Sequence, residues 1–244
     1  MAHTTADSGA APDAPALPLV SRFIGVLTSP KDTFRSIVSH PKWLGMLLLT
    51  TVIIAAGTTI PLTTDGGRQS MLDQQVTFME RFGMKIDDRA YAAMEQRLRY
   101  AAPQQFVSVM LVGPIMAVIF SGILFGIFAI TGGQATFKQL FAVYVHAGVV
   151  IAASQLFLGP LNYFRQSMSS ATNLGVLNLA SDTSFIGRLM GMIDLFWIWW
   201  LIVLAIGLGV LYRRRTQGIA FVMFGVYVVG ILLVATVMSM FGRS

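Results

Sequence analysis

The sequence contains no cysteine and few charged residues, and each of these absences excludes some classes of protein. Without cysteine the chain can form no disulfide, no catalytic thiol and no thiolate ligand for a metal ion. Charged residues make up 11% of the 244 residues, whereas 55% are hydrophobic. Soluble domains carry about 25% charged residues, so a water-soluble globule of this size would lack polar surface. The composition therefore predicts a membrane protein that crosses the bilayer several times.

Recognisable catalytic motifs are also missing. The sequence shows no phosphate-binding loop, nucleotide-binding glycine pattern or nucleophile–base arrangement. A zinc site needs three or four protein ligands, and His146 is the one histidine inside an apolar run. We interpret it as a hydrogen-bonded packing residue. We predict no catalytic residues, no metal site, no cofactor and no enzyme activity.

Long apolar runs are what the sequence does contain. A helix needs about 20 apolar residues to cross the hydrocarbon core. The clearest run extends from Arg188 to Arg215, is interrupted by a single acid, Asp194, and ends in three arginines. We predict an all-α bundle of five transmembrane helices, with spans at about 43–62, 106–130, 139–159, 189–212 and 219–241.

The N-terminal region precedes the first span. Residues 1–18 are rich in Ala and Pro and lack an apolar period, which predicts a disordered cytoplasmic tail. Ser29 stands where a helix N-cap is expected, and Pro30 suits the first helical position. The helix that follows carries Phe34 and Ile37 on one side and is too short to span. We expect it to lie in the membrane interface, the alternative being a docking surface for a soluble partner.

Between the first two spans lies a long polar excursion, residues 63–103, with six basic and six acidic residues. Apolar residues at helical spacing predict two amphipathic helices over the membrane surface. The adjacent acids Asp87 and Asp88 would point about 100° apart on a helix, so we interpret them as a helix start and not as a metal site. Thr136 and Gln139 form a capping-box pattern before the third span.

Basic residues predict the orientation in the membrane. Five spans place Arg213–Arg215, Lys138 and the basic residues before the first span on one side. Because basic clusters favour the cytoplasmic side, we expect a cytoplasmic N-terminus and an extracytoplasmic C-terminus. The net charge of +6 is explained by this topology and by anionic lipid, without nucleic acid. The expected partners are the bilayer, other membrane proteins and a second copy of the chain.

Asp194 is the polar residue that a span is least expected to contain. An acid inside a span costs at least about 2.5–3.5 kcal/mol on insertion scales, so it should face protein or water. Gln155 falls at a similar depth in the third span, as do Thr58 and Thr59 in the first. We predict that Asp194 accepts hydrogen bonds from Gln155 or from these threonines and joins the helices near the outer face. His146 lies deeper, so we expect no Asp194–His146 ion pair.

Several short motifs resemble the Yip1-domain family of membrane proteins. They are residues 23–30 (FIGVLTSP), 41–43 (PKW), the Gly132-Gly133 pair before the third span, and 193–199 (IDLFWIW), which includes Trp199, with Gly207 and Ala220 further on. The resemblance covers about residues 20–241 and implies five spans with a cytoplasmic N-terminus. The Ala- and Gly-rich composition and the lack of glycosylation sequons are compatible with a bacterial inner-membrane member.

Two functions follow as hypotheses. The first is a non-enzymatic scaffold or membrane-organising protein that acts through lipid and protein contacts. The alternative is a small transporter or channel, as an oligomer, that uses Asp194 in a polar path. A transport path needs several polar residues that face one cavity inside the membrane, and the spans offer few besides Asp194, His146 and Gln155.

Overall fold

The computed structural model of the protein describes residues 17–81, 83–177 and 184–241. The predicted tail therefore lies almost entirely outside the described residues, and so do Ser181 and Asp182, either of which the sequence offers as an N-cap for the fourth span. The helices of the described part are α1 (Leu19–Thr28), α2 (Pro30–Ser39), α3 (Leu44–Thr59), η1 (Ile60–Thr63), α4 (Asp65–Arg81), α5 (Asp88–Arg97), η2 (Leu98–Tyr100), α6 (Ala101–Ile130), α7 (Phe137–Ala147), α8 (Val149–Arg165), η3 (Leu174–Leu177), α9 (Phe185–Met192), α10 (Leu195–Tyr212) and α11 (Thr216–Phe241).

Five helical segments are long and apolar enough to cross a membrane, which confirms the predicted all-α membrane fold. They are Leu44–Thr63, Asp88–Ile130, Phe137–Arg165, Leu195–Tyr212 and Thr216–Val237. Two of the helices end or begin elsewhere than the spans expected from the sequence. The third span continues through Pro160 to Arg165, because a proline inside a helix need not end it where neighbouring helices hold the backbone in place. The fourth begins at Leu195 and not at 189.

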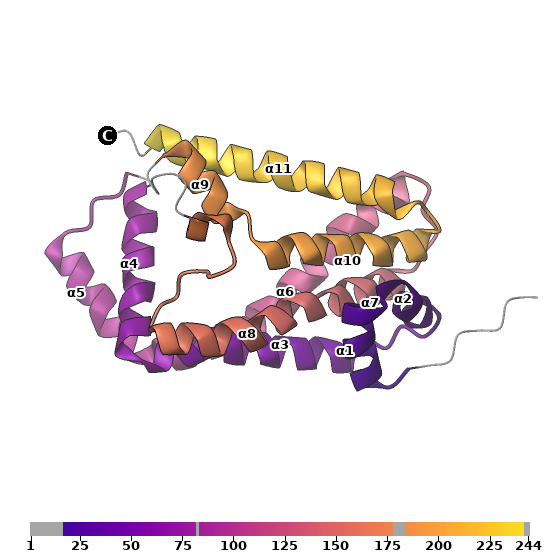
Figure 1. Ribbon diagram of the computed structural model, residues 1–244, viewed down its shortest axis with the longest axis horizontal. Coiled ribbons are helices and arrows are strands. Elements are labelled where there is room, and N and C mark those ends of the chain that lie inside the picture. Colours follow the sequence, from indigo (N-terminus) through magenta and orange to yellow (C-terminus); the bar gives the residue numbers. More distant parts are fainter. Residues whose placement is uncertain (1–16, 82, 178–183, 242–244) are drawn as a thin grey trace, which may run out of the picture.

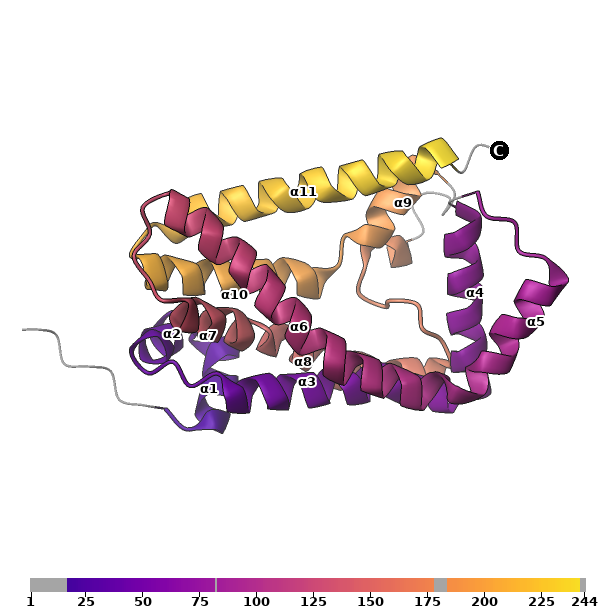
Figure 2. The same ribbon diagram turned by 180° about the vertical axis from the view of Figure 1, so that it is seen from behind.

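The long helices run roughly parallel along the molecule (Figure 1). α3 and α8 form one side, α11 forms the other, and α10 lies between them. Seen from behind, α6 crosses these helices obliquely (Figure 2). α1, α2 and the start of α7 gather at one end, while α4, α5 and α9 gather at the opposite end (Figures 1 and 2).

The core lies where α2, α7 and α10 meet. Phe34 and Ile37 of α2 are fully buried there, together with Leu140 and Val143 of α7 and Leu204 of α10. Our expectation that the apolar side of α2 contacts lipid is therefore wrong. A short amphipathic helix has the same pattern whether its apolar side faces lipid or protein, so the sequence could not separate the two cases.

The basic residues that we used for orientation lie at one end of the bundle. Lys138 opens α7, and the turn with Arg213–Arg215 joins α10 to α11 beside it (Figure 1). The Arg214 guanidinium donates to the backbone oxygen of Thr131 at 2.5 Å, which ties this turn to the end of α6. Thr136 and Gln139 form the predicted capping box at the start of α7. We call this the basic end.

At the opposite end, α4 lies across the ends of the long helices and α5 lies beyond it (Figure 1). These are the two helices predicted for the polar excursion. α5 begins at Asp88, and the Asp87 side chain accepts a hydrogen bond from the backbone N–H of Ala90, as a helix cap does. The interpretation of the two acids as a helix start is confirmed, with Asp87 as the capping residue.

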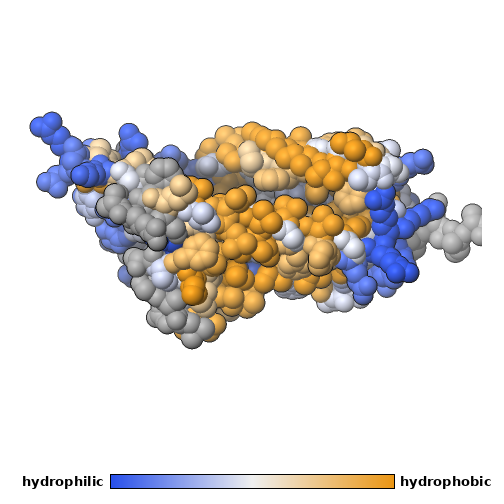
Figure 3. Space-filling view, turned by 90° about the horizontal axis from the view of Figure 1, so that it is seen from above, coloured by the Kyte–Doolittle hydropathy of each residue, from blue (hydrophilic) through white to orange (hydrophobic). Residues whose placement is uncertain are grey.

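Apolar side chains cover the middle of one face of the molecule, between two more polar ends (Figure 3). Exposed apolar side chains of α11 include Phe221, Val226 and Leu233, which are 83%, 69% and 62% exposed. α6 adds Leu111 and Ile115, also largely exposed. A bilayer is the environment in which such a surface is stable, because lipid tails accept apolar side chains without cost.

Close helix packing occurs between α3 and α8, and not at Gly122 and Gly126 of α6, whose GxxxG spacing in the sequence would permit a close helix approach. Added Cβ atoms at Gly122 and Gly126 would meet nothing within 4 Å, so this GxxxG pair serves no contact between the described helices. In contrast, a Cβ at Gly159 of α8 would lie 2.9 Å from the Cα of Gly57 in α3. The sequence pattern missed this contact because the two glycines belong to different helices.

Candidate functional site

Asp194 lies at the end of a span and not inside it. The chain is helical in α9, extended at Ile193 and Asp194, and helical again from Leu195. The Asp194 carboxylate accepts a hydrogen bond from the backbone N–H of Phe196 at 2.8 Å, so it is the N-cap of α10. A carboxylate at this position also interacts favourably with the positive end of the helix dipole. The predicted continuous helix through Asp194 is therefore wrong, since the acid interrupts it.

The second carboxylate oxygen of Asp194 accepts hydrogen bonds from two hydroxyl groups. These are Ser170 at 2.9 Å and Thr172 at 2.6 Å, both in the segment between α8 and α9. The predicted partners Gln155, Thr58 and Thr59 are not the donors in the described structure. Asp194 therefore joins α10 to the preceding loop and not to the helices of the first and third spans.

The same loop is paired with the break between α9 and α10. Leu174 donates its backbone N–H to Ile193 at 2.9 Å, Leu195 donates to Thr172 at 3.2 Å, and an antiparallel bridge joins Asn173 to Asp194. The Tyr227 hydroxyl of α11 donates to the backbone oxygen of Met192 at 2.8 Å. Backbone bonds on both sides of Asp194 therefore hold the cap in place.

The helix α4 of the polar excursion contacts the same loop near the end of α8. The backbone N–H of Met168 donates to the Ser70 hydroxyl of α4 at 2.9 Å. A Cβ at Gly66 would lie 2.6 Å from the Cβ of Gln166, so the start of α4 touches the end of α8 closely. The excursion and the Asp194 loop thus form one cap over this end of the bundle.

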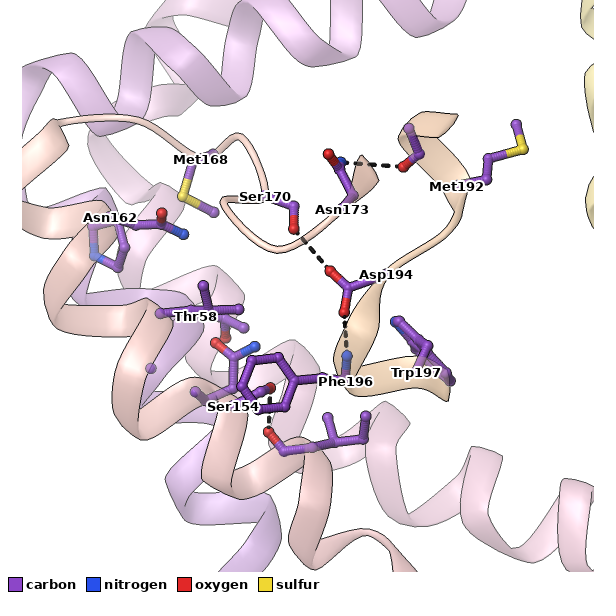
Figure 4. Close-up of a pocket in the computed structure, with 16 residues that line it drawn as sticks. Thr58, Ser154, Asn162, Met168, Ser170, Asn173, Met192, Asp194, Phe196 and Trp197 are labelled. Atoms are coloured by element: carbon purple, nitrogen blue, oxygen red, sulfur yellow. Dashed lines mark hydrogen bonds between the residues drawn. The ribbon is translucent and has the colours of Figure 1, made fainter. Parts of the chain in front are cut away.

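A cavity of about 370 Å³ lies beneath the loop, between α3, α8 and the start of α10 (Figure 4). Its polar lining residues are Thr58, Ser154, Gln155, Asn162, Ser170, Asn173 and Asp194. Thr58 and Gln155 therefore line the same cavity as Asp194, although neither is bonded to the acid. Phe196 and Trp197 supply an apolar wall. The cavity can hold water or a small polar solute.

His146 is fully buried in α7. Its Nδ1 lies 2.7 Å from the backbone oxygen of Ala142, and its Nε2 lies 3.1 Å from a guanidinium nitrogen of Arg22. A carbonyl only accepts, so Nδ1 carries the proton and Nε2 accepts from Arg22. His146 is thus a hydrogen-bonded packing residue in this structure. In the described part of the chain, no three His, Asp or Glu side chains come together as a group that could hold a metal ion.

The remaining candidate residues, Ser29, Pro30 and Trp199, lie at a helix start or pack against the core. Ser29 is the N-cap residue of α2 and Pro30 is its first residue, as predicted, but the Ser29 side chain makes no capping bond. Instead its backbone oxygen accepts from the Thr33 hydroxyl at 2.9 Å. Trp199 packs partly buried against the core, with its ring 6.1 Å from that of Phe196.

Three polar residues that bond to Asp194 or to His146 were not predicted from the sequence. Ser170 and Thr172 gave no signal, because a Ser/Thr-rich loop is the ordinary composition of a connection. Arg22 did give one, since it is a single charge in the short apolar stretch Leu19–Thr28. It is 8% exposed, and its partner His146 lies 124 residues away.

Comparison with known proteins gives one informative match. A family model for the Yip1 domain matches residues 24–238, which is most of the chain and includes all five spans. No characterised protein and no solved structure matches significantly. The matched region contains most of the core, the Asp194 cap and His146, whereas Arg22 lies just before it. The chain therefore belongs to the Yip1-domain family of integral membrane proteins.

Proposed function

We propose that this protein is a non-enzymatic scaffold or membrane-organising component that acts through lipid and protein contacts. The observation that carries the proposal is that the polar groups within its spans and at their ends form bonds that support the fold. Asp194 caps a helix and binds a loop, and His146 bonds to Arg22 and Ala142. Both are engaged in bonds that support the fold, whereas the outer surfaces of α6 and α11 present exposed apolar side chains.

The proposal includes the location and orientation expected from the sequence. We place the protein in a bacterial inner membrane with the N-terminus in the cytoplasm. Support comes from the basic end, where Lys138 and Arg213–Arg215 gather with α1 and α2, because basic clusters favour the cytoplasmic side.

A photo-crosslinking experiment tests the scaffold proposal. The photoreactive amino acid benzoylphenylalanine would replace Phe221 or Leu111, which are 83% and 62% exposed, and the buried Leu208 would serve as the control position. In native membranes we expect crosslinks from the exposed positions to one or a few defined membrane proteins or to a second copy. Crosslinks to lipid alone, at both exposed positions, would contradict a protein scaffold.

The alternative, a small transporter or channel, is favoured by one observation, the polar cavity of about 370 Å³ that Asp194 lines. Sealed vesicles containing the purified protein and a pH-sensitive dye separate the two functions. A scaffold should leave proton and ion flux at the level of empty vesicles, with wild type and Asp194→Asn alike. A flux that wild type supports and Asp194→Asn abolishes would favour transport and overturn the scaffold proposal.

A further inference from the structure

A second cavity, of about 470 Å³, lies at the basic end of the bundle. Three cations line it, and they come from three different elements: Arg22 from α1, Lys42 from the connection between α2 and α3, and Lys138 from α7. The other lining residues are Pro41, Trp43, Leu44 and Gly45. The tertiary structure therefore brings three basic residues from distant parts of the sequence to one cavity, whose exposed lining is mostly apolar.

Arg22 is the buried member of this group, at 8% exposed. Its guanidinium donates to the backbone oxygen of Lys42 at 2.5 Å and to Nε2 of His146 at 3.1 Å. Its Nε is buried and has no hydrogen-bond partner among the described residues. Both partners are neutral, since the first is a backbone carbonyl and the second is a histidine that donates from Nδ1 to the backbone oxygen of Ala142 and accepts at Nε2.

No carboxylate balances these charges in the described part of the chain. The ion pairs found there join Arg35 to Asp32 and Arg68 to Asp65, and neither involves the cations of the cavity. Burial lowers the pKa of the Arg22 guanidinium, yet an arginine stays protonated at neutral pH. A buried charge without a counter-charge is costly, so an anion bound beside Arg22 would stabilise this end of the bundle.

The surroundings of the cavity distinguish a lipid from a dissolved anion. Leu44 lines the cavity and is 56% exposed, and Leu48, one turn further along α3, is 52% exposed. Val20 and Ile24 of α1 are 65% and 54% exposed. Apolar side chains thus lead from the cavity along α3 into the bilayer. Trp43, whose ring contacts Phe141 at 5.0 Å, adds the aromatic residue typical of the headgroup level.

We propose that this cavity binds the phosphate of an anionic phospholipid, with Arg22, Lys42 and Lys138 around the headgroup and an acyl chain along Leu44 and Leu48. Charge-assisted bonds from arginine and lysine to phosphate are the stronger class of hydrogen bond. Basic pockets between transmembrane helices are suited to anionic headgroups. The inference rests on the membrane location of the protein and does not require the scaffold role.

The test uses the purified full-length protein in an uncharged detergent. Phosphatidylglycerol or phosphatidylcholine is added in increasing amounts, and the thermal unfolding temperature is followed. The Lys42→Gln/Lys138→Gln variant removes two cations of the cavity, and both side chains are exposed, so the fold should persist. The matched control, Lys31→Gln/Arg215→Gln, removes two exposed charges at the same end without touching the cavity.

Wild type and the control should be stabilised by phosphatidylglycerol and much less by phosphatidylcholine. The cavity variant should need about tenfold more phosphatidylglycerol for the same shift, since loss of a charge-assisted bond to phosphate weakens binding by that order. Arg22→Gln, if it folds, should lose the response as well. An unchanged response in the cavity variant, or an equal loss in the control, would overturn the site.

The same measurement is repeated with glycerol 3-phosphate and with inorganic phosphate, because they carry the anion without acyl chains. At equal concentration they should produce no comparable stabilisation. If either stabilises wild type as strongly as phosphatidylglycerol does, the cavity recognises a dissolved phosphate and the lipid assignment is wrong. None of these readouts depends on crosslinks to protein partners, so failure of the scaffold proposal and failure of the lipid site remain distinguishable.

Discussion

The ring of Phe34 in α2 packs directly against Gly207 in α10, where a Cβ added to the glycine would lie 3.0 Å from the ring atom Cε1. The same Cβ would lie 2.6 Å from Cγ1 of Val143 in α7. Phe34 and Val143 are fully buried. Three helices thus meet at a point that has no room for one more methyl group, and this contact buries α2 in the protein.

Replacement of Gly207 by alanine should therefore destabilise the bundle, by about 1–3 kcal/mol for an overpacked core. The measurement is the thermal unfolding temperature in detergent. Val143→Ala in the same chain should recover part of the loss, because it removes the atom nearest to the added methyl. Gly225→Ala in α11, where the added Cβ meets nothing within 4 Å, is the control and should be neutral or stabilising. A Gly207→Ala variant as stable as that control would refute the packing.

The α3–α8 contact gives a second prediction. A Cβ at Gly159 would meet backbone atoms of Gly57, and a backbone cannot move aside as a side chain can. Gly159→Ala should therefore separate the two helices and lower the unfolding temperature, with a cost again of about 1–3 kcal/mol. Gly126→Ala, in open space on α6, is the matched control. Equal stability of the two variants would show that the helices are not in close contact.

Asp194 should act as a cap and a loop anchor. Its two oxygens accept three hydrogen bonds, whereas asparagine has one acceptor oxygen in its side chain. The unfolding temperature should therefore fall in the order wild type, Asp194→Asn, Asp194→Leu. Loss of a helix cap costs about 0.5–2 kcal/mol. Asp88→Asn, at an exposed position of α5, is the control and should have little effect. If Asp194→Leu is as stable as wild type, the anchoring role is wrong.

Arg22 and His146 should be energetically coupled. His146→Leu leaves a buried donor of Arg22 without its partner, and Arg22→Met leaves Nε2 of His146 without a donor, so each single variant should be destabilised. The double variant should lose less than the sum of the two, with a coupling energy of about 0.5–3 kcal/mol. The free energy of unfolding in detergent is measured for wild type, the two single variants and the double variant. The control cycle pairs His146→Leu with Thr236→Val on the exposed side of α11, where additive effects are expected. Additivity in the first cycle would contradict the bond.

The topology can be tested by thiol labelling, because the natural sequence has no cysteine. Single cysteines would be placed at Thr77 in α4, at Ser169 in the Asp194 loop and at Gln217 in α11. The first two lie at the end opposite to the basic end, and Gln217 lies at the basic end. With the N-terminus inside, an impermeant reagent added to intact cells should label positions 77 and 169 only. Labelling at 217 and at neither of the others would reverse the orientation.

Much of this fold could be predicted because its determinants are local. Length and apolarity decide which segments can span, and the Thr136–Gln139 box and the Asp87 cap are recognised within four residues. The environment of Asp194 could not be predicted in this way. Its position in an apolar run suggested an acid inside a helix, and only the loop with Ser170 and Thr172 explains why the helix breaks there.

The sequence by itself determined the membrane class, the five spans and the basic character of one end, since each depends on composition within one segment. Tertiary structure alone decided that α2 is buried in the core, that Gly57 meets Gly159, and that Arg22 reaches His146 across 124 residues. The physical reason is that an amphipathic surface, a glycine or a lone charge specifies a requirement for burial, close approach or a partner. Which neighbour meets that requirement depends on how the helices pack.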